Sequence, residues 1–242
     1  MRVEVRFTIP EAASADLIGA TAVVVDVLRA TTTLTTALSH GARAVFPAAS
    51  TEDALRLAQS LGREDTLLCG ERKGLRIEGY DLGNSPREYA RETVEGKRLI
   101  MNTTNGTRAF LAVEDADAVV ALSFLNLGAV ASEVRDREHL LILCAGREDA
   151  FALEDAVCAG LLLQRLQEEG VEVDPDDGAR AALSLARSHE VSEAFLASTQ
   201  AGQALNAAGL GGDLEWCARV DALATVPAMK DRTLAPLSAQ GR

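Results

Sequence analysis

Short apolar runs alternate with longer Ala- and Leu-rich stretches along most of the chain. Seven of these runs read as strands, and several are apolar at consecutive positions, which is typical of strands covered on both faces. The expected strands are Val3–Thr8, Thr21–Val27, Ala44–Pro47, Thr66–Gly70, Arg98–Asn102, Ala118–Leu122 and Leu140–Cys144. Strands that alternate with helices predict an α/β fold, with a layered sheet and helices on both of its faces.

The stretches between the strands have the composition and periodicity of helices. The expected helices are Thr32–Ser39, Thr51–Leu61, Thr107–Val113, Leu125–Val134 and Leu153–Glu168. After a turn at Asp174–Gly178, the segment Ala179–Gly209 is mostly helical. Because no linker rich in Gly, Ser or Pro precedes this helical C-terminal part, we expect residues 1–242 to form a single domain.

The order of strand, Thr-rich polar turn, helix and strand occurs more than once. Residues 22–50 and 98–124 share it, and residues 140–160 begin a third copy. If the strands of these units are parallel, their polar turns lie at the carboxyl ends of the strands. Open α/β sheets bind their ligands at that edge, so the turns are the first places to look for chemistry.

The first polar turn places an acid, an arginine and three threonines directly after a buried strand. We expect Asp26 and Arg29 to be catalytic, because a carboxylate at the sheet edge and an arginine within reach of a phosphate suit phosphate chemistry. Thr31, Thr32 and Thr33 are expected substrate-binding residues at a helix N-terminus, where N–H groups and the dipole favour an anion. The alternative is simple helix capping, which explains one Thr but not the whole group.

The second polar turn follows the apolar strand Arg98–Asn102. Its Asn-Gly pair favours positive φ, and its short side chains are rich in hydrogen-bond donors. Such a turn is typical of an anion cradle built from backbone and hydroxyl groups, although an ordinary turn with an N-cap is the alternative. The expected substrate-binding residues here are Asn102, Thr103, Thr104, Asn105, Gly106 and Thr107.

The third turn follows the strand that ends at Cys144 and is rich in acids. Glu154 and Asp155 enter a helix with an apolar face, and acids in a first helical turn are common for dipole reasons alone. If they face Asp26 across adjacent strand ends, the carboxylates complete an all-oxygen site of the kind that binds Mg²⁺. We therefore expect Asp26, Glu154 and Asp155 to be metal ligands.

A fourth polar stretch, after the strand Thr66–Gly70, is dense in charge and glycine. Glu71 is expected to be a further catalytic residue, as a general base or metal ligand. Asn84 and Ser85 precede a proline that signals a helix start, and we expect them to bind substrate. The neighbouring Arg72 and Lys73 either bind a second anionic group of the substrate or are simply solvated.

Charge and composition exclude several classes of partner. The net charge is −12 without a basic run, which argues against nucleic acid and against a basic membrane-binding face. No apolar stretch approaches the ~18 residues that span a bilayer, the N-terminal residues alternate like a strand rather than a signal peptide, and the cysteines lack metal-ligand spacing. We expect a cytoplasmic protein with neither nucleic acid nor membrane as a partner.

Taken together in this order, the polar motifs closely resemble one family, the 2-phosphosulfolactate phosphatases. The motifs that carry the resemblance are VVVDVLRATTT, GERKGLRIEGYDLGNSP, NTTNGT, CAGREDAFALEDAVCAG and DLEWCARVDALATVP. The resemblance implies an α/β fold and Mg²⁺-dependent hydrolysis of 2-phospho-3-sulfolactate to 3-sulfolactate and phosphate, so the expected ligand is a small, doubly anionic phosphate ester. In methanogens this reaction belongs to coenzyme M biosynthesis.

Several alternatives stay open at this point. The nucleophile is either a metal-activated water or Asp26 itself, which would form an aspartyl phosphate. The substrate is either the sulfonated acid or another small phospho-acid such as phospholactate or phosphoglycolate. A protein of a different class, a non-catalytic small-anion-binding protein, would have less use for a carboxylate cluster. A homodimer is expected only because symmetric dimers are common among soluble enzymes.

Overall fold

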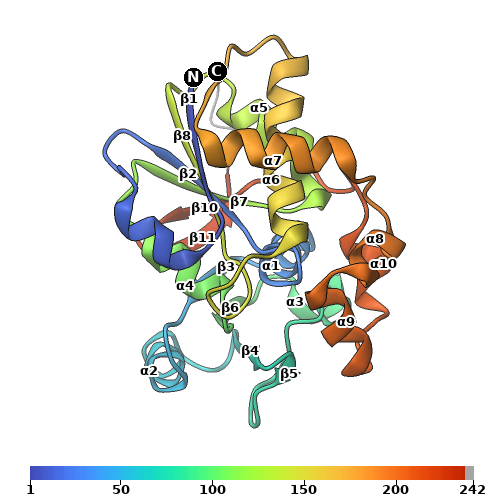
Figure 1. The fold of residues 1–242 in the computed structure, drawn as a ribbon. Helices are drawn as coiled ribbons and strands as arrows, with labels where there is room; N and C mark the ends of the chain where they lie inside the picture. Colours follow the sequence, from blue (N-terminus) through green and yellow to red (C-terminus); the bar gives the residue numbers. More distant parts are fainter. Residues whose placement is uncertain (238–242) are drawn as a thin grey trace.

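The structure is a computed structural model, and it describes residues 1–237 (Figure 1). Within these residues, eleven strands form one mixed sheet in the order β5-β4-β6-β3-β11-β10-β7-β2-β8-β1-β9. The strands are β1 (Arg2–Arg6), β2 (Thr21–Val25), β3 (Ala44–Pro47), β4 (Thr66–Arg72), β5 (Leu75–Arg76), β6 (Arg98–Asn102), β7 (Ala118–Leu122), β8 (His139–Cys144), β9 (Asp174–Pro175), β10 (Pro227–Lys230) and β11 (Thr233–Pro236).

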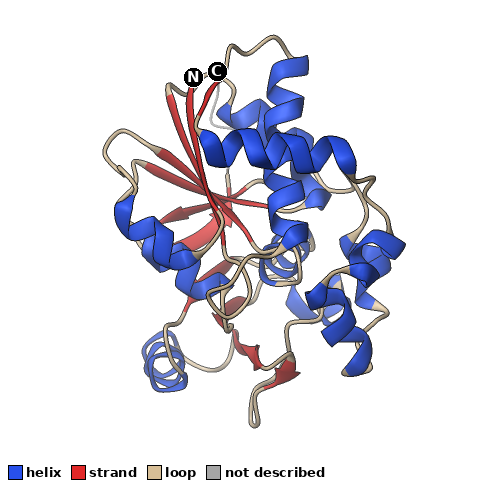
Figure 2. Cartoon of the chain, in the orientation of Figure 1, coloured by secondary structure: helices blue, strands red, loops and turns tan. Residues whose placement is uncertain are grey.

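Helices surround this sheet, and Figure 2 shows them on both sides of the strands. The α-helices are α1 (Ala30–Ser39), α2 (Thr51–Leu61), α3 (Arg91–Val94), α4 (Gly106–Ala112), α5 (Leu127–Val134), α6 (Leu153–Glu168), α7 (Asp177–Ser188), α8 (Glu193–Ser198), α9 (Gln200–Ala207) and α10 (Asp213–Cys217). Three short 3₁₀ helices, η1 (Ile9–Ser14), η2 (Pro86–Glu88) and η3 (Phe124–Asn126), lie between them. The α/β class, the predicted strands and the predicted helices are thus confirmed. The short strands β5 and β9 and the hairpin β10–β11 were not predicted.

The antiparallel hairpin of β10 and β11 lies in the middle of the sheet, between two groups of parallel strands. One group contains β4, β6 and β3, and the other contains β7, β2, β8 and β1. Since β11 is antiparallel to β3, β10 to β11, and β7 to β10, the two groups run in opposite directions.

Hydrophobic clusters fill the space between the sheet and its helices, and β2 contributes to the two larger ones. Neighbouring residues of a strand point to opposite faces, so Val24 of β2 joins the cluster that contains Leu34 of α1 and Phe110 of α4. Val25 belongs to the other cluster, with Leu162 of α6. Both valines are fully buried, which explains why this strand is apolar at consecutive positions.

The internal repeat corresponds to two units, β2–α1–β3 and β6–α4–β7. Each unit starts in one parallel group and ends in the other, so the two units connect the groups in opposite senses. Their helices begin at equivalent positions, and the two first residues touch. A Cβ on Gly106 would lie 2.3 Å from the Cβ of Ala30 and 2.9 Å from Oδ2 of Asp26. Gly106 is therefore required for close packing beside Asp26.

The C-terminal part is helical, as predicted, and α8, α9 and α10 lie beside the carboxyl ends of the strands rather than over a face of the sheet (Figure 1). Within residues 1–237, none of the helices combines the length and the apolar character that crossing a membrane requires.

Candidate active site

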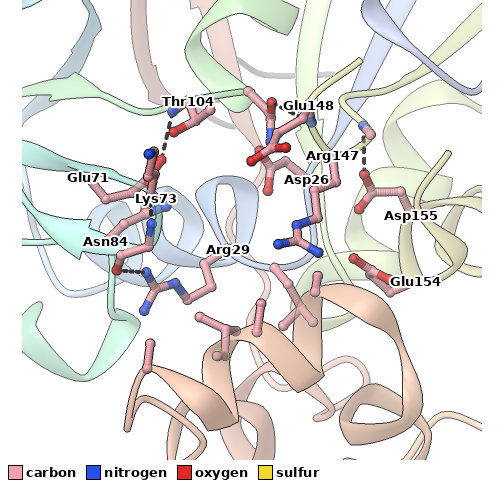
Figure 3. A pocket seen from close by; sticks show the side chains of 18 residues that line it. Asp26, Arg29, Glu71, Lys73, Asn84, Thr104, Arg147, Glu148, Glu154 and Asp155 are labelled. Atoms are coloured by element: carbon pink, nitrogen blue, oxygen red, sulfur yellow. Dashed lines mark hydrogen bonds between the residues drawn. The ribbon is translucent and has the colours of Figure 1, made fainter. Parts of the chain in front are cut away.

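A pocket of about 280 Å³ lies where the carboxyl ends of four strands from both parallel groups converge (Figure 3). Asp26 follows β2, Gly146 to Glu148 follow β8, Glu71 to Gly74 lie at the end of β4, and Thr104 and Asn105 follow β6. Ligand pockets typically measure roughly 300–1,000 Å³, so this one suits a small ligand. The polar turns do lie at the carboxyl ends of their strands, but the strands are parallel only within each group, because β4 and β6 run opposite to β2 and β8.

Three carboxylates of the pocket are buried side by side. Burial raises the pKa of Asp26 to about 7; the Ala30 N–H opposes this rise, and the nearby charges of Glu71 and Glu154 add to it. Burial also raises the pKa of Glu154. Burial, and then the charges of Glu154 and Asp26, raise the pKa of Asp155 well above its ordinary value. Ionising all three in a dry site is costly unless a cation or protons compensate the charge.

The hydrogen bonds of two of these carboxylates fix the loops after β2 and β8. Asp26 Oδ1 accepts the N–H of Ala30 at 3.1 Å, and Asp155 accepts the N–H groups of Val27 at 2.8 Å and Gly146 at 3.2 Å. Among the hydrogen bonds of residues 1–237, none reaches Asp26 Oδ2. Asp155 thus joins the two loops, while Asp26 keeps one oxygen available for a ligand.

The chemistry of this group of carboxylates fits Mg²⁺. Within the described chain, no three acidic, His or Cys side chains already surround a common point as metal ligands. Mg²⁺ typically takes only one or two protein carboxylates, with waters and substrate phosphate oxygens completing its octahedron. Asp26 and Glu154 supply such oxygens, and burial, the main cause of their raised pKa values, makes their ionised forms costly without a compensating cation.

Arg29 is a fixed cation at the other side of the pocket. Its guanidinium donates to Asp213 Oδ2 at 2.7 Å and to the carbonyl of Gly74 at 2.8 Å, and both charged side chains are almost fully buried. The second oxygen of Asp213 accepts the hydroxyl of Ser85 at 2.6 Å. Two of the five N–H groups of Arg29 are therefore engaged, and the fork is held rigidly with its remaining donors available.

Glu71 lines the pocket but has a structural task as well. Its Oε1 accepts the N–H of Thr104 at 2.7 Å and its Oε2 accepts the N–H of Gly74 at 2.8 Å. The carboxylate therefore ties the ends of β4 and β6 together. Asn84 also lines the pocket, and its side-chain Oδ1 is buried without a hydrogen-bond partner among the described residues.

The expected substrate-binding threonines of the first turn, and Ser85, lie behind the residues that line the pocket. The hydroxyls of Thr31 and Thr32 donate to backbone carbonyls of the β2–α1 turn, and that of Thr33 donates to the carbonyl of Asn84. Their hydroxyls are thus used to build the turn. Ser85 is bound to Asp213, as described above.

The residues of the second turn also divide into some that line the pocket and some that only support it. Thr104 and Asn105 line the pocket. Thr103 and Thr107 hydrogen-bond each other across the first turn of α4, and the side-chain oxygen of Asn102 accepts from Arg72. Gly106 provides the close approach to Asp26.

Lys73, for which substrate binding or solvation were both open, lines the pocket. Several further lining residues had no role predicted from the sequence: Arg147 adds positive charge, and α9 with the residue after it forms a largely apolar wall of Ala201, Ala204, Leu205 and Ala208. Arg147 could have been found from its place directly after a buried strand. The alanines give no chemical signal, and only the tertiary structure brings α9 to the site.

The chain is similar over most of its length to one protein family and to several known proteins. A family model described as 2-phosphosulpholactate phosphatase matches residues 7–232. A Thermotoga petrophila protein is 40% identical over 210 residues, covering 86% of this chain and 88% of the relative. A Clostridium perfringens protein is 41% identical over 221 residues, covering 90% and 89%. One from Symbiobacterium thermophilum is 41% identical over 214 residues, covering 88% and 92%. All three are named "Probable 2-phosphosulfolactate phosphatase".

Proposed function

The chain belongs to the 2-phosphosulfolactate phosphatase family, and from that premise we propose that it is a Mg²⁺-dependent phosphatase that hydrolyses 2-phospho-3-sulfolactate to 3-sulfolactate and phosphate. The observation that supports this most directly is one pocket in which buried carboxylates on one side face a fixed arginine on the other. A phosphate ester bound between them would meet a divalent cation and a guanidinium together.

Each group of the pocket has a task in this reaction. Asp26 and Glu154 would hold Mg²⁺, with Asp155 fixing the loops that present them; the bound cation would neutralise charge on the phosphoryl oxygens. Arg29, held in place by Asp213, would orient the phosphate through its remaining donors. Asn84, whose Oδ1 has no partner within residues 1–237, would accept a hydrogen bond from a water in the pocket.

The bond changes are those of a phosphoryl transfer. An oxygen nucleophile bonds to phosphorus, the ester P–O bond breaks, and the departing alkoxide takes up a proton to become the C2 hydroxyl. The nucleophile is either water or Asp26. Borohydride reduction of a quenched single turnover separates the two, because it converts an aspartyl phosphate to homoserine: homoserine in place of Asp26 would favour the covalent route, and intact Asp26 would favour water.

The test is phosphate release from 2-phosphosulfolactate, phospholactate and phosphoglycolate, each with Mg²⁺ or with EDTA. We expect turnover of the sulfonated ester that EDTA abolishes and that Asp26→Asn lowers by about 100-fold or more. Asp136→Asn, at a carboxylate that is 91% exposed, is the matched control and should leave the rate unchanged. Preference for an ester without sulfonate would change the substrate but keep the chemistry. No release from any ester would favour a non-catalytic anion-binding protein.

A further inference from the structure

Arg147 stands on a rigid hairpin at the edge of the pocket. Its N–H donates to the Ala150 carbonyl at 2.8 Å, and the Ala150 N–H donates back at 2.9 Å. The two residues between them have positive φ, 52° at Glu148 and 62° at Asp149, as in a type I′ turn. Non-glycine residues rarely adopt this conformation and tend to do so at functional sites.

Contacts with the neighbouring loops hold this hairpin in place. Asp149 pairs with Arg108 of α4 at 3.0 Å, and the N–H of Glu148 donates to Asn105 Oδ1 at 3.3 Å. The ring of Phe151 packs edge-on against Phe7, with centroids 5.3 Å apart. These contacts and the hairpin hydrogen bonds fix the backbone of Arg147 at the edge of the pocket.

The guanidinium of Arg147, by contrast, is hardly engaged. Its one hydrogen bond within residues 1–237 reaches the Gln200 carbonyl at 3.4 Å, and the ion pairs of this part of the chain do not include it. Arg29 makes two bonds of 2.7 and 2.8 Å. Figure 3 shows both side chains extending into the pocket, Arg147 from the side of Glu154.

Arg147 also has room to move. It lines a second cavity of about 220 Å³, which shares Arg147, Glu154 and Ala201 with the first. The guanidinium stands at the boundary of the two spaces, so it can turn toward a ligand without displacing packed side chains.

The proposed substrate has three anionic groups of different character. Phosphate and carboxylate oxygens are the ones that Mg²⁺ prefers, whereas a sulfonate is a weak base and a poor metal ligand. A sulfonate suits a guanidinium, which is weakly hydrated and offers several donors in one plane. Lys73, the remaining cation of the pocket, is exposed at the rim, and an ammonium there stays strongly hydrated.

We propose that Arg147 binds the sulfonate of the substrate and so sets the specificity of the site for a sulfonated over an unsulfonated phospho-acid. This inference rests on the proposed function. The competing explanation is that Arg147 only offsets the charge of Glu154, and then its loss would affect every substrate alike.

The experiment compares kcat/KM for 2-phosphosulfolactate and 2-phospholactate in the wild type, Arg147→Gln and Arg147→Lys. We expect Arg147→Gln to lower kcat/KM for the sulfonated ester by roughly 10- to 100-fold, mainly through KM, because one charge-assisted contact is lost. The value for phospholactate should change by less than about 3-fold, and Arg147→Lys should recover part of the preference. Arg108→Gln, which loosens the same hairpin from outside the pocket, is the matched control and should leave the ratio of the two values unchanged.

The role of Arg147 would be overturned if Arg147→Gln left the ratio of the two kcat/KM values unchanged, whether both values fell equally or neither fell. A binding measurement separates this role from the proposed activity. Calorimetry with 3-sulfolactate and lactate needs no turnover, and Arg147→Gln should weaken only the binding of sulfolactate. If the wild type hydrolyses neither ester but binds sulfolactate through Arg147, the proposed activity fails and the sulfonate site stands. If Arg147→Gln binds sulfolactate as the wild type does, the sulfonate site fails.

Discussion

Arg29 and Asp213 form a buried ion pair in which each charge depends on the other. Removing two charges from water costs free energy that their attraction seldom recovers in full, so such a pair is weak evidence for stability. Its value here is orientation: Asp213 holds Arg29 with one oxygen while Ser85 holds the other oxygen. A residue from the C-terminal helices thus positions a side chain from the first polar turn.

We predict that Asp213→Asn lowers kcat/KM by roughly 10- to 100-fold, because Arg29 keeps a hydrogen bond but loses the charge that fixes it. Phosphate-release kinetics and the affinity for inorganic phosphate would measure this. Glu215→Gln, in the same short helix, removes an exposed ion pair with Arg219 and serves as the control. Wild-type phosphate affinity in a folded Asp213→Asn protein would contradict the positioning role.

At the scale of residues, the sequence located the carboxylates of the pocket better than the residues that support it. A carboxylate at or just after the end of a buried strand can hardly avoid the sheet edge, and Asp26 and Glu71 both line the pocket. Hydroxyls are less predictable, because a buried one must find an acceptor and the nearest is often a carbonyl of its own turn. Thr31 and Thr32 do so, and no pattern in the sequence distinguishes this from ligand binding.

Helix α9 forms one wall of the pocket. Ala201 and Ala204 line the pocket, while Asn206 and Ala207 of the same helix are exposed. Because alanine side chains are short, this wall leaves the space that a three-carbon acid with several anionic groups needs. Shape here is set by side chains that have no chemistry of their own.

Ala204→Leu should therefore raise KM for the sulfonated ester by about 10-fold or more, since the added carbons occupy the pocket and clash with bound substrate. Ala207→Leu changes an exposed alanine of the same helix, one turn after Ala204, and should leave KM within about 2-fold of the wild-type value. Steady-state kinetics on both variants, with melting temperatures to confirm folding, would test this. An unchanged KM in Ala204→Leu would mean that α9 does not contact the substrate.

Among the elements, the hairpin β10–β11 shows what local patterns cannot reveal. Both strands have four residues, and Pro227 and Pro236 lie opposite each other at the open end of the hairpin. Proline in a short run argues against a central strand, because it lacks the N–H of a ladder hydrogen bond. Here the prolines occupy the ends of the strands, so the hairpin still fits in the middle of the sheet.

The buried carboxylates affect the stability of the whole molecule. The pKa of Asp26 is about 7 in the folded protein, above its ordinary value near 4. In that range the folded state binds more protons than the unfolded state, so this residue lowers the free energy of unfolding as pH rises from about 4 to about 7. Below about pH 4 the residue does not lower the free energy of unfolding, and above about pH 7 the lowering is complete.

We predict that Asp26→Asn stabilises the protein in EDTA, and does so more at pH 7.5 than at pH 5.5. Asparagine keeps an oxygen for the Ala30 N–H but cannot ionise. Mg²⁺ at 100 times its dissociation constant should raise the free energy of unfolding of the wild type by about 2.7 kcal/mol, and that of the mutant much less. Urea unfolding at both pH values would measure these differences. If Asp26→Asn stabilised the protein equally at both pH values, that result would contradict the raised pKa of Asp26.

The central position of the β10–β11 hairpin has a consequence for how the protein is made. The ribosome releases β3 and β7 long before β10 and β11, which are synthesised more than a hundred residues after β7. At 5–20 residues per second, the inner edge of β7 waits roughly 5 to 20 seconds for β10, and that of β3 waits roughly 10 to 40 seconds for β11. During that interval the nascent chain presents two open strand edges, which invite pairing with other chains. The sheet is completed from its centre and last of all, so we expect unfinished chains to aggregate when chaperones that shield nascent strands are depleted.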